Sequence, residues 1–216
     1  MLGFSLRLDD RTPTVLCVGA HCDDIEIGCG GTLRQLRALY PDAPVHWVVL
    51  SSTPERRAEA LDSALNWLPG APPEVQVFGF RDGFLPYDPI PVKTQIGALA
   101  ASVSPDVVFA HSGKDAHQDH RFVSELVWNH FRDHVVLEYE IPKYDADLGH
   151  PNVFVPLSRS ECERKAADIL SVFRSQRGKD WLTVDTVLAL ARLRGIESRS
   201  PTGFAEGFHL RKAILF

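Results

Sequence analysis

Short apolar runs alternate with amphipathic segments along most of the chain. Runs rich in Val, Leu, Ile and Phe predict strands at 14–19, 45–50, 75–78, 106–110 and 135–139. Apolar residues at helical spacing predict helices over 32–39, 56–68, 92–103, 122–131, 158–173 and 182–193, and a short strand near the C-terminus. Because continuous apolar strands that alternate with helices are buried on both faces, the pattern predicts an α/β fold with a mostly parallel sheet between two helical layers.

The alternation breaks after Glu140. Residues 141–157 hold three prolines, three aspartate or asparagine residues and one glycine, which predicts a long irregular loop. Within it, Lys143, Tyr144, Asp145 and His150 are candidates for sugar or phosphate contacts. A solvated loop or an oligomer contact is the alternative, and a homo-oligomer therefore remains possible.

Composition narrows the class of protein. The length of 216 residues is typical of one domain, so we expect 1–216 to form a single domain. A net charge of −5 argues against a nucleic-acid partner and against a polybasic membrane surface. We expect no transmembrane segment, because no apolar run approaches the ~20 residues that span a bilayer, and no secretory signal in the short, charged N-terminus. Four cysteines do not form a disulfide framework, which indicates a reducing, cytoplasmic location.

A first cluster of polar residues follows the first predicted strand. His21, Asp23 and Asp24 lie where that strand ends, and ligands of open α/β sheets bind at the carboxyl ends of strands. His21 and Asp24 are three residues apart, so both can face one metal ion on a tight turn, while Asp23 is free for a second role. Alternatively, the aspartates cap the following helix and His21 bonds beside them.

A second cluster, "HSGKDAHQDHR", spans residues 111–121 and follows the fourth predicted strand. It contains His117, Asp119 and His120, with His111 and Asp115 nearby, and lies on the same sheet edge. A catalytic zinc ion has three protein ligands and an open position for water. One histidine and one aspartate from the first cluster and one histidine from the second supply that count. A polar loop that is rich in histidine by chance is the alternative.

These residues carry a family resemblance. "AHCDDIEIGCGGTL" resembles the "AHPDDE…GCGGTL" motif of the LmbE/PIG-L zinc-dependent deacetylases, and "HQDHR" resembles their H-P-D-H motif. "RRAEALDSAL", "FGFRDG" and "FAEGF" are similar to three weaker motifs of that family, in the same order. The resemblance covers most of the chain and implies a Rossmann-like three-layer sandwich with a mostly parallel sheet.

The resemblance also implies roles for individual residues. It assigns His21, Asp24 and His120 as ligands of Zn²⁺ or another divalent ion, and Asp23 as the general base. It assigns His117 as the electrophile or general acid and Asp119 as the residue that orients it. Arg56 and Asp82 match positions near the substrate; their alternatives are an ion pair of Arg56 with Glu59 and a simple turn at Asp82-Gly83.

Two features of the first motif need separate explanation. Cys22 replaces the family's proline, and its thiol is either a soft metal ligand or, as we expect, packed in the core behind the turn. The glycines at 28–31 lack the G-x-G-x-x-G spacing of a dinucleotide site and lack G-K-[ST]. We therefore interpret them as allowing close packing of a helix against the sheet.

The resemblance implies an enzyme that hydrolyses an N-acetyl group on an N-acetylglucosamine-type sugar or glycoconjugate, giving acetate and a free amine. Two alternatives stay open. One is a metal amidase that acts on a larger amide, such as a thiol conjugate. The other is a non-catalytic module that binds a sugar nucleotide at the same sheet edge.

Overall fold

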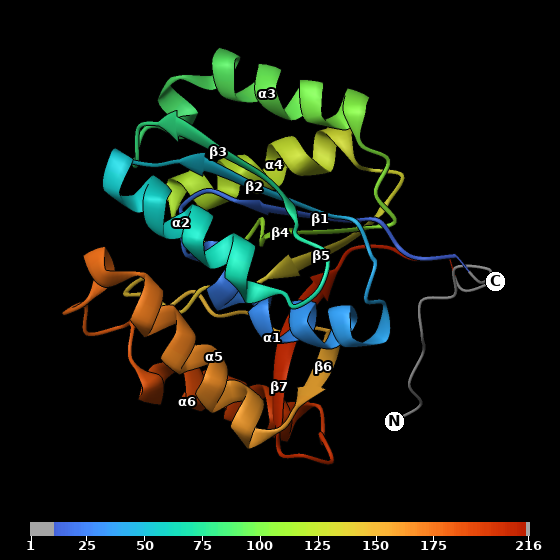
Figure 1. Ribbon diagram of the computed structural model, residues 1–216, viewed down its shortest axis with the longest axis vertical. Helices are drawn as coiled ribbons and strands as arrows, with labels where there is room; N and C mark the ends of the chain where they lie inside the picture. Colours follow the sequence, from blue (N-terminus) through green and yellow to red (C-terminus); the bar gives the residue numbers. More distant parts are fainter. Residues whose placement is uncertain (1–10, 215–216) are drawn as a thin grey trace.

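One seven-stranded sheet runs through the protein, in a computed structural model that describes residues 11–214 (Figure 1). The strands lie in the order β3-β2-β1-β4-β5-β7-β6. Their bounds are β1 Val15–Gly19, β2 Val45–Ser51, β3 Glu74–Phe80, β4 Val107–His111, β5 Val135–Tyr139, β6 Val153–Leu157 and β7 Phe204–Leu210. β1 to β5 pair in parallel, whereas β7 is antiparallel to both β5 and β6. The prediction of a mostly parallel sheet is confirmed.

Helices cover both faces of the sheet, so the three-layer α/β sandwich is also confirmed (Figure 1). One face carries α1 Asp24–Leu39, α2 Pro54–Trp67, α5 Arg159–Val172 and α6 Val184–Glu197; the other carries α3 Pro89–Ser102 and α4 Gln118–His130. Two short 3-10 helices, η1 Leu85–Tyr87 and η2 Arg174–Gln176, lie in connections. The side chains of successive β1 residues pack alternately into the hydrophobic core on one face of the sheet and the core on the other, as expected for a strand buried on both sides. No helix among residues 11–214 is long and apolar enough to cross a bilayer.

The glycine-rich stretch lies inside α1 rather than before a helix. α1 begins at Asp24, eight residues earlier than the sequence predicted. A Cβ atom on Gly28 would lie 2.2 Å from the ring of Tyr139, and one on Gly31 would lie 2.6 Å from Leu157. The expected close packing of this helix is thus confirmed. Glu206 of β7 fixes the same turn, because its carboxylate accepts hydrogen bonds from the backbone N–H groups of Gly31 and Thr32.

Replacing Gly28 with alanine should destabilise the protein, although alanine is normally the better helix former. Intrinsic propensity favours alanine by about 1 kcal/mol, but overpacking a core costs about 1–3 kcal/mol. The Tyr139 ring cannot yield easily, since it is fully buried and its hydroxyl donates to the Val18 carbonyl oxygen at 2.8 Å. Urea unfolding should show a lower free energy of unfolding for Gly28→Ala. Gly79→Ala is the matched control, because a Cβ atom there meets nothing within 4 Å; equal stability of the two variants would contradict the packing argument.

The prediction of an irregular loop over 141–157 is wrong at its C-terminal end. Residues 153–157 form β6, which pairs with β7 at the edge of the sheet. The strand tolerates Pro156 because an edge strand leaves part of its backbone without a ladder partner. Residues 141–152 are irregular, as expected.

Candidate metal centre and cleft

The turn that joins β1 to α1 positions the first cluster. The His21 backbone N–H donates to Asp24 Oδ2 at 2.6 Å, which closes the turn at the start of α1. Asp23 directly precedes α1, but its side chain forms no capping hydrogen bond. Its Oδ1 instead lies 3.0 Å from a guanidinium nitrogen of Arg56 on α2. The alternative in which the Asp23 carboxylate caps the helix is therefore not observed.

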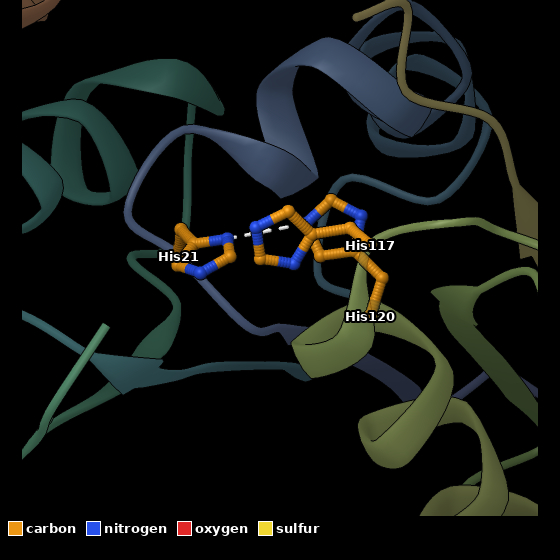
Figure 2. A group of neighbouring side chains, drawn as sticks. All are labelled: His21, His117 and His120. Atoms are coloured by element: carbon orange, nitrogen blue, oxygen red, sulfur yellow. Dashed lines mark hydrogen bonds between the residues drawn. The ribbon is translucent and has the colours of Figure 1, made fainter. Parts of the chain in front are cut away.

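The second cluster lies at the start of α4, which begins four residues earlier than predicted. His117 is the residue just before the helix, and Asp119 and His120 are in its first turn. Figure 2 shows His21 facing His117 and His120 across a small gap. The ring centroid of His21 lies 5.0 Å from that of His117 and 5.1 Å from that of His120. The structure thus joins the two clusters, which lie some ninety residues apart in the chain.

Donor atoms of the three predicted metal ligands lie at spacings that fit a divalent ion, with Asp24 approaching each histidine through a different carboxylate oxygen. His21 Nδ1 lies 3.1 Å from His120 Nε2 and 3.4 Å from Asp24 Oδ2, and His120 Nε2 lies 3.6 Å from Asp24 Oδ1. Ligand atoms 2.0–2.2 Å from a tetrahedral zinc ion lie about 3.3–3.6 Å apart. Among the described residues, three groups bring one ligand atom each within 4.8 Å of one another: His21 with His117 and His120, Asp24 with His111 and His120, and His21 with Asp82 and Asp119. Each group contains one or two of the predicted ligands. The donor set of imidazole and carboxylate suits zinc and other divalent transition metals.

Asp115 and His111, which the sequence analysis named only as neighbours of the second cluster, contact two of the predicted ligands. Asp115 Oδ2 lies 2.9 Å from His120 Nδ1, which leaves Nε2 of that ring for an ion. His111 is fully buried; its Nε2 lies 3.0 Å from Asp24 Oδ2 and accepts a hydrogen bond from the Ala20 N–H. These contacts were not predicted from the sequence. The feature of the sequence that could have indicated them is the high density of histidine and aspartate residues after β4.

The carboxylate of Asp119 faces His21 rather than His117. It accepts hydrogen bonds from the backbone N–H groups of Gly83 and Leu85, and its Oδ2 lies 3.3 Å from His21 Nε2. The contact with His117 runs through the backbone, where the Asp119 N–H donates to His117 Nδ1 at 3.3 Å. That Asp119 orients His117 stays a prediction. In this structure the group of Asp119 that contacts the His117 ring is its backbone N–H.

Arg56 links Asp23 to Asp82. Its guanidinium lies 3.0 Å from Asp23 Oδ1 and 3.3 Å from Asp82 Oδ2. Asp82 Oδ1 is also 3.1 Å from His21 Nε2, so the turn at Asp82 and Gly83 belongs to the site. The alternative ion pair of Arg56 with Glu59 is not observed, because Glu59 accepts hydrogen bonds from Ser175.

The two adjacent aspartates have opposite electrostatic environments. Burial and the neighbouring Asp24 charge raise the pKa of Asp23, against the opposing charges of Arg56 and His21. Burial alone would also raise the pKa of Asp24, but the surrounding histidines hold it well below its usual range. Asp23 is therefore the carboxylate better suited to take up a proton, and Asp24 the one better suited to remain an anionic ligand.

Cys22 packs behind the turn, as expected. Its thiol is fully buried and donates to the Ser51 carbonyl oxygen at 3.5 Å. Burial raises the pKa of this thiol to about 12. Because metal ligation requires a thiolate, the geometry gives Cys22 a packing role.

A cleft with a volume of about 410 Å³ opens over the two clusters. Its floor is formed by the residues His21, Asp23, Asp24, Arg56, Asp82, His117 and His120. One wall consists of Ile141, Lys143, Tyr144 and Asp145, and the other of Gln176, Lys179 and Trp181. The walls thus come from the irregular segment before β6 and from the segment around η2. Three of the four loop candidates line the cleft, and His150 is not among its lining residues.

Comparison with known proteins gives one family match. The family model for PIG-L, described as GlcNAc-PI de-N-acetylase, matches residues 16–131. This range contains both clusters and ends at the residue that follows α4. A search of curated proteins gave no significant match.

Several solved structures share the fold. N,N'-diacetylchitobiose deacetylase from Pyrococcus horikoshii is 22% identical with a TM-score of 0.73, over 92% of this chain and 83% of that one. The 4-carboxy-2-hydroxymuconate hydratase from Pseudomonas putida is 18% identical with a TM-score of 0.72, over 95% and 98%. A zinc-inhibited form of a teicoplanin deacetylase is 15% identical with a TM-score of 0.67, over 91% and 97%. At these identities the likeness shows the fold, and the chemistry has to be argued from the site.

Proposed function

This chain belongs to the PIG-L family, and from that premise we propose that it is a zinc-dependent hydrolase that removes an N-acetyl group from an N-acetylglucosamine-type sugar or glycoconjugate. The observation that carries the proposal is the convergence of His21, Asp24 and His120, whose pairwise donor distances are 3.1–3.6 Å through one nitrogen of each histidine and both Asp24 oxygens. The Asp23 carboxylate lies beside them on the floor of an open cleft. The four cysteines are all free, in keeping with a reducing, cytoplasmic location.

The side chains of the cleft can divide the reaction among them. His21, Asp24 and His120 would hold the ion, which when bound supplies a Lewis acid that polarises the amide carbonyl and acidifies water. Asp23 takes a proton from the attacking water, whose oxygen forms a bond to the acyl carbon. His117 donates a hydrogen bond to the developing oxyanion. The C–N bond then breaks, and the departing nitrogen takes the proton from Asp23 or His117, which gives acetate and a free amine.

Arg56 and Asp82 are proposed to shape the floor where the substrate lies. The guanidinium of Arg56 pairs with the Asp23 carboxylate, so it holds that carboxylate toward the cleft. Asp82 is half-exposed beside His21 and has room to accept a hydrogen bond from a sugar hydroxyl. These two assignments place the substrate contacts on α2 and on the turn after β3.

The names of the structural relatives support an acetylated sugar as the substrate. They also show that proteins of this fold catalyse different reactions. Two of the three are deacetylases, one of a chitobiose derivative and one of teicoplanin. The third is a hydratase with an equally similar fold. A metal amidase for a larger amide and a non-catalytic binding module remain the alternatives. An enzyme is favoured, because the buried carboxylate of Asp23, whose pKa is raised, lies next to the proposed metal ligands.

A product assay tests the proposal. The zinc-loaded protein should release acetate and an equal amount of primary amine from at least one member of a panel of N-acetylated sugars and glycoconjugates. A matched panel with longer N-acyl chains and thiol-conjugate amides separates the deacetylase from the amidase. If the protein binds zinc but releases no acid from either panel, the proposed activity is wrong and the binding module is favoured.

A further inference from the structure

Lys143 is a nearly buried cation at the edge of the proposed metal site. It lies in the irregular segment between β5 and β6, and its side chain is only 9% exposed. Its Nζ lies 3.0 Å from Asp115 Oδ1 and also pairs with Asp147, four residues later. A lysine is seldom buried to this degree unless its charge is paired with an anion.

The anion in question, Asp115, connects two functional histidines. Its side chain is 4% exposed. Oδ2 lies 2.9 Å from His120 Nδ1, and Oδ1 accepts a hydrogen bond from the His117 backbone N–H at 2.8 Å. With Nδ1 of His120 donating to this carboxylate, the lone pair of Nε2 points toward His21 and Asp24. The orientation of His120 therefore depends on where the Asp115 carboxylate lies.

The segment that carries Lys143 is joined to this carboxylate at more than one point. Asp147 Oδ2 accepts a hydrogen bond from the backbone N–H of Ala116 at 2.6 Å, directly after Asp115. The same segment supplies Ile141, Tyr144 and Asp145 to one wall of the cleft. A contact thus runs from the cleft wall through Lys143 and Asp115 to a predicted metal ligand.

We propose that Lys143 is a positioning residue, whose ammonium group fixes the Asp115 carboxylate and thereby holds His120 in its metal-binding orientation. The proposal rests on the metal site of the proposed function, and it couples the cleft wall to that site. It also revises the sequence interpretation of Lys143 as a sugar or phosphate contact, because the ammonium group is already engaged by two carboxylates. Removal of its charge leaves Asp115 Oδ1 with only the His117 backbone N–H as a donor, so the carboxylate is held less firmly against His120.

Zinc affinity without any substrate is the direct readout. Lys143→Met keeps most of the side-chain length and removes the charge. Loss of a group that hydrogen-bonds to a metal ligand typically weakens binding about 10–100-fold, and Lys143 acts one contact further out, so we expect competition with a chromophoric chelator to show zinc binding weakened about 10-fold. Lys143→Arg, which restores a cation, should recover part of the loss. Lys93→Met is the control, because Lys93 is an exposed lysine on α3 away from the cleft. Loss of the wall structure alone would raise KM and leave the zinc affinity unchanged, which would overturn the proposal.

A double-mutant cycle tests whether Lys143 acts through Asp115. Asp115→Asn alone should also weaken zinc binding, and adding Lys143→Met to it should have little further effect. Independent, multiplicative losses would overturn the proposal. If Lys143→Met does not fold, Lys143→Gln takes its place in the cycle. A wild-type protein that binds zinc but releases no acetate would contradict only the proposed activity, because this assay needs no substrate.

Discussion

Asp23→Asn is expected to lower kcat by about 10²–10⁴-fold, the range typical of a lost general base, while zinc stays bound. The amide has nearly the same shape as the carboxylate and keeps an oxygen toward Arg56, whose guanidinium lies 3.0 Å from Asp23 Oδ1. It cannot take a proton from water. The effect should therefore fall on the chemical step and leave the fold and the three predicted metal ligands in place.

The measurement combines steady-state kinetics with zinc content on the same preparation of Asp23→Asn. Asp168→Asn is a matched control, since Asp168 pairs with Arg34 and does not line the cleft. It should keep the kcat of the wild type. A near-normal kcat for Asp23→Asn at full zinc occupancy would show that another group takes the proton.

His120→Ala is expected to abolish stoichiometric zinc binding and, with it, the activity. The substitution removes the Nε2 atom that lies 3.1 Å from His21 Nδ1 and 3.6 Å from Asp24 Oδ1. Loss of an orienting residue alone weakens a metal site about 10–100-fold, so loss of a ligand should weaken it by more than about 100-fold. Elemental analysis should give about one zinc per chain for the wild type and almost none for the variant, after both pass through the same chelating column.

His130→Ala is the control on the same helix. His130 ends α4, about 15 Å from His120 at the usual helical rise of 1.5 Å per residue. It should keep both the zinc and the activity. Zinc retained in His120→Ala would mean that one of the overlapping groups, such as His21, Asp82 and Asp119, holds the ion instead. Chelation of the wild type and restoration by added zinc complete the test.

The predicted elements succeeded where local pattern and burial agree. β1, β2, β4 and β5 are apolar runs whose residues are buried on both faces of the sheet, so the sequence carried their signal plainly. The start of α1 was missed because glycine disfavours helices. Tertiary packing overrides that preference here, since the helix must approach Tyr139 and Leu157 too closely for any Cβ atom. β6 was missed because Pro156 and the preceding prolines are typical of a loop.

For the site residues too, some contacts could be predicted from the sequence and others could not. The two clusters could be joined in advance because both follow parallel strands, and parallel strands end on one sheet edge. The link between Lys143 and Asp115 could not, because neither residue type nor spacing tells which of several loop carboxylates a lysine will meet. The same holds for Asp119, whose carboxylate faces His21 through contacts with the turn at Gly83. Contacts between irregular segments depend on loop paths that hydrophobic periodicity does not encode.

The place of β7 in the sheet has a consequence for the synthesis of the protein. β7 is the last strand in sequence but lies between β5 and β6, and its Glu206 bonds to the Gly31 and Thr32 amides of α1. The helix that begins with a predicted metal ligand therefore reaches its final packing only after residue 206 has left the ribosome. Contacts between residues so distant in sequence slow folding. We therefore expect α1 to stay incompletely packed in the nascent chain until β7 has been synthesised. We therefore expect the nascent chain to bind zinc tightly only late in translation, close to the release of the finished chain.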